Sequence, residues 1–112
     1  GRAIVVAASD PASLRDAARA TDVLLAENAR IEAQLVVNRV SPVLYRRMQA
    51  TIDDVMDGVG LPLLGIVPED SGVTLAAAKG VPLPLYSEKG AARACRNIAR
   101  RLCGQKVPLM LF

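Results

Sequence analysis

Histidine is absent from the 112-residue sequence, which removes the usual general base at neutral pH and the commonest metal ligand. Aromatic residues make up only 3% of the chain, too few for the stacking platforms on which nucleic-acid-binding domains hold bases. The net charge of +3 is too small to imply a nucleic-acid partner by itself, and no apolar run is long enough to span a bilayer. These shortages disfavour histidine-based catalysis and base stacking on an aromatic surface.

The two cysteines, Cys95 and Cys103, lie eight residues apart in a helical pattern and form no Cys-x-x-Cys pair. Zinc binding and dithiol redox chemistry are therefore not expected, and no metal site is predicted. Free cysteine is among the most buried residue types, so we expect both thiols to be reduced and mostly buried. The sequence also contains no phosphate-binding GxxxxGK[ST] loop and no dinucleotide-binding GxGxxG turn, and we assign no catalytic residue.

Apolar runs with little alternation, which are typical of strands covered on both faces, alternate along the chain with segments of helical spacing. The predicted strands are residues 3–8, 33–40 and 61–70. The predicted helices are residues 11–28, 51–60, 71–80 and 88–104. Residues 81–86 contain two prolines, which exclude them from the middle of a sheet, so we expect an extended edge segment there.

Capping residues indicate where these helices begin and end. Asp10 is a predicted N-cap, Pro11 suits the first helical position, and Asn28 is expected to help end the same helix. Ser87 is predicted to cap the last helix. The inner stripe of that helix is predicted to contain Ala91, Ala94, Cys95, Ile98 and Leu102. Its arginines are expected to face water or a partner: Arg93, Arg96, Arg100 and Arg101.

Alternation of strands and helices predicts an α/β fold with a mostly parallel sheet and right-handed crossovers. We expect a single domain over residues 1–112, in a partial three-layer α/β/α arrangement with a sheet of three to four strands. Parallel sheets need helices on both faces, so a sheet this thin resembles part of a larger one.

Polar residues follow two of the predicted strands, at the sheet edge where open parallel sheets bind ligands. Asn38 and Arg39 end the second strand, and Val67, Pro68, Glu69 and Asp70 end the third. An asparagine amide can match the hydrogen-bonding edge of a purine, and an arginine can lie flat on an aromatic ring. A proline followed by acidic residues holds a loop rigid, so these residues together can frame an adenine.

Each of these features also has a purely structural explanation. Asn38 can end a strand in a turn while Arg39 is a solvated charge. Glu69 and Asp70 can be the N-cap and first-turn acids of the next helix, a role compatible with binding. The basic and then apolar residues 100–112 can contact an anionic membrane, or they can end the last helix and pack as an apolar tail.

Five segments in this order resemble the ParA/MinD group of deviant-Walker P-loop ATPases: SLRDAARATDVL, LVVNRV, VGLPLLGIVPED, AAAKGVPLPL and AARACRNIARRLCGQKVPL. The resemblance covers nearly the whole chain and implies the C-terminal half of a P-loop ATPase fold. It implies that Asn38 and Arg39 bind the adenine base and that Val67, Pro68, Glu69 and Asp70 form the other wall. It also implies that a further set of residues lies near an ATP-dependent dimer face where partners dock: Ser13, Arg15 and Asp16.

The function implied by this resemblance is division-site placement by an ATP-binding cell-division regulator. The resemblance implies that the intact protein binds ATP or ADP with Mg²⁺ as its cofactor. The family's phosphate-binding loop, magnesium ligands and switch segments lie outside these residues. We therefore expect little nucleotide binding and no ATP hydrolysis by this chain alone, because hydrolysis needs positioned phosphates and Mg²⁺.

Implied partners of the intact protein are the division inhibitor and the topological regulator of the Min system, with no nucleic acid. The implied location is the cytoplasm, with peripheral inner-membrane association through segments outside this sequence. An exposed strand edge leads us to expect self-association as a dimer. Two alternatives stay open: a ParA-type ATPase of chromosome partition or flagellar number control, or a non-enzymatic α/β protein-interaction module.

Overall fold

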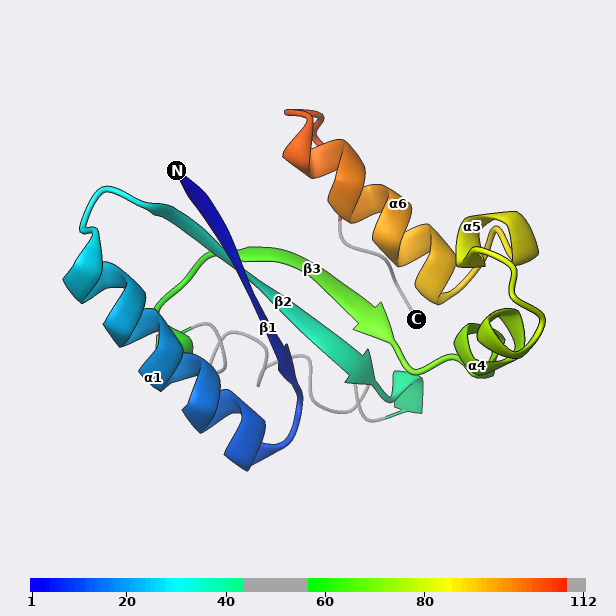
Figure 1. Ribbon diagram of the computed structural model, residues 1–112, viewed down its shortest axis with the longest axis horizontal. Coiled ribbons are helices and arrows are strands. Elements are labelled where there is room, and N and C mark those ends of the chain that lie inside the picture. The colour runs from blue at the N-terminus through cyan, green and yellow to red at the C-terminus, as the bar shows by residue number, and fades with distance from the viewer. Residues whose placement is uncertain (44–56, 109–112) are drawn as a thin grey trace.

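A computed structural model describes residues 1–43 and 57–108 of the chain. In these residues three parallel strands form one sheet in the order β1-β2-β3 (Figure 1). The strands are β1 (Arg2–Ala8), β2 (Glu32–Val40) and β3 (Leu63–Pro68). The helices are α1 (Pro11–Glu27), α4 (Ser71–Ala78), α5 (Leu83–Tyr86) and α6 (Ala91–Leu102). The predicted α/β fold with a parallel sheet is confirmed.

The face of the sheet that packs on α1 contains the larger apolar cluster. Val5 and Ala7 of β1 and Leu35 and Val37 of β2 meet Ala17 of α1 in this cluster. Successive side chains of a strand point to opposite faces, which explains the spacing of two residues within each strand. Leu35 is fully buried and belongs to β2, the central strand of the described sheet, so this cluster lies at the centre of the sheet.

The opposite face packs on α6. Val36 of β2 and Leu64 of β3 lie in a second cluster with Ala91 and Ala94, two small residues that let the helix approach the sheet closely. Gly65 of β3 is part of this close approach, because a Cβ atom at that position would overlap the side chain of Ile98. Helices therefore cover both faces, as the three-layer prediction requires.

Coverage of the α6 side is incomplete over β1, one of the two edge strands of the described sheet (Figure 1). Val6 lies beside Val36 in register and so shares its face of the sheet. Ile4 and Val6 are nevertheless 41% and 61% exposed, whereas Val36 is buried. The three-layer arrangement is therefore partial, as predicted.

Local sequence signals located the ends of α1 correctly. Asp10 is its N-cap and accepts a hydrogen bond from the Ser13 N–H, Pro11 is its first residue, and Asn28 is its C-cap. Asp70 is the N-cap of α4, so the structural explanation given above for this residue is confirmed. For the predicted helix over 51–60, residues 44–56 lie outside the described ranges; residues 57–59 are helical and Gly60 follows with a φ of 82°.

Two predictions about the segments before α6 are wrong. Residues 81–86 are not an extended edge segment, because Leu83–Tyr86 form α5 with a proline in the first turn, where the missing N–H costs nothing. Ser87 is the C-cap of α5 and does not cap α6, whose N-cap is Gly90.

The faces of α6 also differ from the prediction. Cys95 lies outside the inner stripe, where Ala92 and Asn97 are buried instead. The prediction that both thiols are mostly buried is wrong, because both cysteines are exposed. Arg96 donates to the Pro84 carbonyl, and Arg101 donates to the carbonyls of Leu64, Val107 and Pro108. These two guanidiniums thus hold neighbouring backbone in place and do not simply face water.

Candidate functional site

The carboxyl ends of the three parallel strands meet at one edge of the sheet, here called the carboxyl edge (Figure 1). Ala8 at the end of β1 pairs with Asn38, and Val40 at the end of β2 pairs with Pro68. The start of α1, the Asn38–Arg39 pair and the loop after β3 all lie at this edge. The structure therefore brings the predicted base-binding residues together.

The end of β2 leaves the regular strand conformation. Arg39 has a φ of 56° and is the one non-glycine residue with positive φ in the described ranges. The pairing with β3 is irregular between Val37 and Val40, so Asn38 and Arg39 lie outside the regular pairing of β2 with β3. A left-handed backbone costs a non-glycine residue about 1–2 kcal/mol, and such strain concentrates at ligand-binding sites.

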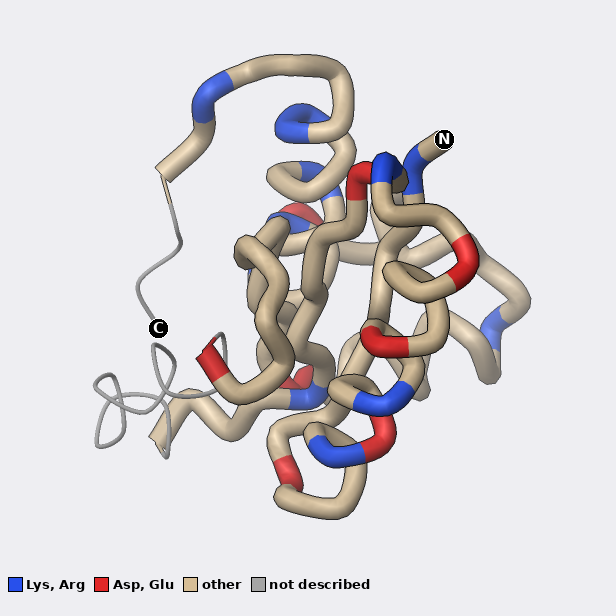
Figure 2. The backbone as a smooth tube through the Cα atoms, turned by 90° about the vertical axis from the view of Figure 1, so that its left-hand side faces the viewer, with Lys and Arg blue, Asp and Glu red and all other residues tan. Residues whose placement is uncertain are grey.

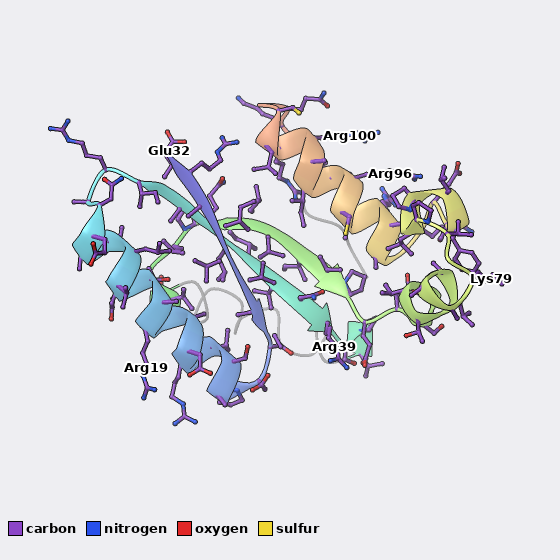
Figure 3. All side chains as sticks on the ribbon, in the orientation of Figure 1. Arg19, Glu32, Arg39, Lys79, Arg96 and Arg100 are labelled. Atoms are coloured by element: carbon purple, nitrogen blue, oxygen red, sulfur yellow. The ribbon has the colours of Figure 1, made fainter. Side chains whose placement is uncertain are left out.

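Asn38 is half-buried, and its side chain supports the turn. Its Oδ1 accepts a hydrogen bond from the Arg39 N–H at 2.9 Å. Among residues 1–43 and 57–108, none accepts a hydrogen bond from its Nδ2. Arg39 itself is exposed, and Figure 3 shows it at the end of β2 near the loop to α4.

The loop after β3 is tied directly to the end of β2. Val67 and Pro68 are buried, whereas Glu69 is exposed. The Glu69 N–H donates to the Val40 carbonyl at 2.8 Å. This bond sets the two predicted walls of the site side by side, an arrangement that follows from parallel pairing of β2 and β3.

Asp70 is half-buried, and its carboxylate is engaged on both oxygens. Oδ1 accepts from the Gly72 N–H at 2.8 Å, and Oδ2 accepts from the Ala91 N–H at 3.0 Å. The first contact caps α4 and the second reaches the start of α6. The N-cap preference of aspartate predicted the first contact, whereas no local pattern predicted the second.

The residues predicted for a partner surface lie in the first turns of α1. The Ser13 hydroxyl accepts from the Ala8 N–H at 2.9 Å and thereby closes the connection from β1. Arg15 and Asp16 are exposed. Both basic and acidic residues lie along α1, as Figure 2 shows, whereas the residues of α6 include arginines and no acid. Of the three predicted residues, Arg15 and Asp16 are thus exposed, whereas Ser13 is half-buried.

The carboxyl edge presents amide, guanidinium and backbone groups. The Asn38 amide, the Arg39 guanidinium and the backbone of the 67–70 loop provide directional hydrogen bonds and a planar cation. A phosphate chain needs a cradle of backbone N–H groups and a lysine, and the sequence contains no such loop. In the described ranges, no group of three or more acidic or cysteine side chains could hold a metal ion, and no helix is long and apolar enough to cross a membrane.

No family model matches the chain. The chain is 35% identical over 112 residues to the septum site-determining protein MinD of Synechocystis sp. and 36% identical over 112 residues to that of Bacillus subtilis. These alignments include 98% and 99% of the chain but 42% of each relative. The chain therefore spans about two-fifths of the length of these relatives.

Solved structures give the same result. The MinD cell division protein of Aquifex aeolicus is 28% identical with a TM-score of 0.86, covering 97% of this chain and 46% of that one. A MinC:MinD cell division protein complex from the same organism gives a TM-score of 0.87 at 29% identity, covering 97% of this chain and 45% of that one. MinD of Pyrococcus horikoshii, complexed with Mg-ADP, gives 0.72 at 25% identity and covers 90% of this chain and 40% of that one. The fold of this chain is thus that of part of a MinD-type P-loop ATPase.

Proposed function

We propose that this chain, which matches MinD proteins over nearly its whole length, is the base-holding part of an ATP-binding cell-division regulator that helps to place the division site. The observation that carries the proposal is the bond from the Glu69 N–H to the Val40 carbonyl. It joins the two segments predicted to hold the base. The likeness to a MinD complexed with Mg-ADP supports a nucleotide as the ligand.

The Asn38 amide recognises the hydrogen-bonding edge of the adenine in this proposal. Its Oδ1 is already held by the Arg39 N–H, so the amide plane is fixed before a ligand arrives. The Arg39 guanidinium packs on the ring, and the backbone of Val67 to Asp70 forms the opposite wall. Preorganised contacts of this kind lose little entropy on binding.

Base contacts alone provide only weak affinity. Association costs several kcal/mol of translational and rotational entropy, so we expect a dissociation constant for adenosine of about 1 mM or weaker. Phosphates and Mg²⁺ would be held by other segments of the intact protein, whose bound nucleotide is ATP or ADP. The 112-residue chain by itself does not hydrolyse ATP in this account, because it contains no phosphate-binding loop.

The partner surface proposed for the intact protein is the first two turns of α1, presented by Arg15 and Asp16. A division inhibitor is the proposed partner, supported by the likeness to the MinC:MinD complex, and a topological regulator is the second. The intact protein works in the cytoplasm and associates peripherally with the inner membrane through other segments. No nucleic acid is involved.

The 112-residue chain also self-associates in this account. Ile4 and Val6 form an exposed apolar patch on β1, an outermost strand with no second neighbour among the described residues. Unpaired strand edges and uncovered apolar faces favour pairing with another chain. A dimer that joins two β1 strands covers both.

Nuclear magnetic resonance (NMR) titration of the ¹⁵N-labelled chain with adenosine tests base binding. Amide shifts should be confined to residues 38–40 and 69–70, and Asn38→Ala should abolish them. The matched control is Gln34→Ala, which removes a half-buried amide from the same strand and should leave the titration unchanged. Equal shifts in the Asn38→Ala chain, or none in the wild type at saturating adenosine, would contradict the proposal and favour a protein-interaction module.

A further inference from the structure

A single carboxylate caps two helices of this fold. Asp70 Oδ1 accepts the Gly72 N–H in the first turn of α4, and Oδ2 accepts the Ala91 N–H at the first residue of α6. The first N–H groups of a helix have no partner within the helix, and a neighbouring side chain ordinarily accepts one of them. Here the cap of α6 comes from a residue 21 positions earlier.

Gly90, the residue before α6, cannot supply this cap. It has no side chain, and its backbone lies at φ 59° and ψ −127°. Glycine adopts this conformation readily, whereas other residues do so only with strain. A Cβ at position 90 would also overlap Asp70 Oδ2. The glycine is thus required twice, once for the backbone angle and once for the space that the carboxylate fills.

We infer that Asp70 is a positioning residue that fixes the loop after β3 by linking it to both α4 and α6. The loop is then held at three points: the Glu69 N–H on the Val40 carbonyl, and the two oxygens of Asp70 on Gly72 and Ala91. Since both oxygens bind protein donors, Asp70 acts on a base only through the backbone that it holds. This last consequence, and only this one, rests on the proposed function.

Electrostatics and packing support the same role. A carboxylate is stabilised near a helix N-terminus by the partial positive charge there, and Asp70 lies at two such termini. α6 is also packed tightly on β3 at Gly65, where no Cβ could be accommodated without moving Ile98. Movement of α6 would therefore be transmitted to the loop both directly through Asp70 and through β3 at Gly65.

Substitution of Asp70 by asparagine is the direct test. Asparagine keeps the shape but has one acceptor oxygen, so it can cap one of the two helices and must turn an NH₂ group toward the other N–H. In Asp70→Asn, hydrogen exchange of the Gly72 or Ala91 amide should rise by about tenfold. The Glu69 amide should exchange faster as well, because the loop is no longer held. Adenosine should bind several-fold more weakly.

Asp10→Asn is the matched control. Asp10 caps α1 through one oxygen and one N–H, that of Ser13 at 3.0 Å, and asparagine serves equally well at such a position. This variant should leave the exchange of every loop amide and the affinity for adenosine unchanged. A loss of protection after β3 in the Asp10→Asn chain would show a general loss of stability and would contradict the inference.

Gly90→Ala tests the contact from its other side. The added Cβ should displace the carboxylate and reproduce the faster exchange at Ala91 and Glu69. Gly80→Ala is its control, because Gly80 has a similar φ of 66° but nothing within 4 Å of an added Cβ. The double variant Asp70→Asn with Gly90→Ala should lose less hydrogen-exchange protection than the sum of the losses in the two single variants, because both substitutions disrupt the same contact.

The outcomes separate the two proposals. If the wild-type chain does not bind adenosine, the proposed function fails, while the exchange rates of Gly72, Ala91 and Glu69 still decide the role of Asp70. If Asp70→Asn leaves all three amides as protected as in the wild type, the inference is overturned. It is also overturned if the helix amides lose protection while the Glu69 amide does not.

Discussion

The two faces of the sheet differ in how much of their apolar surface is buried. On the α1 face, residues from all three strands are buried, including Val5 of β1, Leu35 of β2 and Ile66 of β3. On the α6 face, Val36 and Leu64 are buried but the β1 side chains are exposed. One face is thus covered by the chain itself, and the other is covered only over β2 and β3.

Chain connectivity explains the difference. The crossover from β1 to β2 carries α1 across the sheet beside both strands, whereas α6 follows β3 and packs beside that strand. In the described ranges no other helix of comparable length lies on the α6 side.

The largest effect should come from truncating the buried leucines. Leu35 on the α1 face and Leu64 on the α6 face are 0% and 1% exposed, so Leu35→Ala and Leu64→Ala should each cost about 2–5 kcal/mol of unfolding free energy. Val6→Ala, in the exposed apolar patch on β1, should cost less than about 0.5 kcal/mol of unfolding free energy. Urea denaturation at micromolar concentration measures all three, and a cost for Val6→Ala that equals the other two would show that the patch is covered.

The next largest effect should come from the helix contact on the α6 face. Gly65→Ala forces Ile98 away from β3 and should destabilise the chain by about 1–3 kcal/mol. Gly58→Ala is the control: an added Cβ meets nothing within 4 Å there. Because residue 58 is helical, alanine should stabilise the chain by about 0.5–1 kcal/mol. Equal thermal melting of the two variants would show that α6 does not press on β3.

Self-association should depend on the exposed apolar patch on β1 and not on exposed valine in general. Val6→Lys should weaken the dimer by about tenfold or more, because a buried lysine in the interface loses its hydration. Val23→Lys alters a valine of nearly equal exposure, 63% against 61%, on the outer side of α1 and should have no effect. Sedimentation equilibrium compares them, and a wild-type chain that is monomeric at tens of micromolar would contradict the proposed dimer.

The smallest effect concerns the thiol on α6. Cys95 reaches the surface, but burial of part of its side chain raises the pKa of the thiol. A raised pKa leaves less thiolate at a given pH, and the thiolate is the reactive form. In the Cys103→Ser variant, a disulfide reagent near pH 8 should therefore react more slowly with folded chain than with chain unfolded in urea. Equal rates would mean that the folded chain does not shield the Cys95 thiol.

The sequence predicted the better-covered face more accurately than the other. Asp10, Pro11 and Asn28 are local signals and marked the ends of α1 correctly. The start of α6 was missed because its cap comes from Asp70, far away in the sequence, and no local rule contains that contact. Prolines near Leu83 suggested an extended segment because the same residue suits both a strand edge and a first helical turn.

The candidate site was predictable in position but not in detail. Parallel strand ends meet at one edge, so Asn38 and the loop after β3 had to lie close together. The left-handed backbone of Arg39 could not be foreseen, because glycine and asparagine are the residues that favour it. The double use of Asp70 was hidden for the same reason as the start of α6.

The most direct test of adenine binding by these residues is to detect the base itself at the carboxyl edge. Intermolecular nuclear Overhauser effects between adenosine and the ¹³C,¹⁵N-labelled chain report protons within about 5 Å, close to van der Waals contact between neighbouring groups. Adenine bound at this edge should give effects from its protons to both the Asn38 amide and the exposed Glu69 residue. Effects confined to another surface, or none when adenosine is saturating, would contradict this proposal.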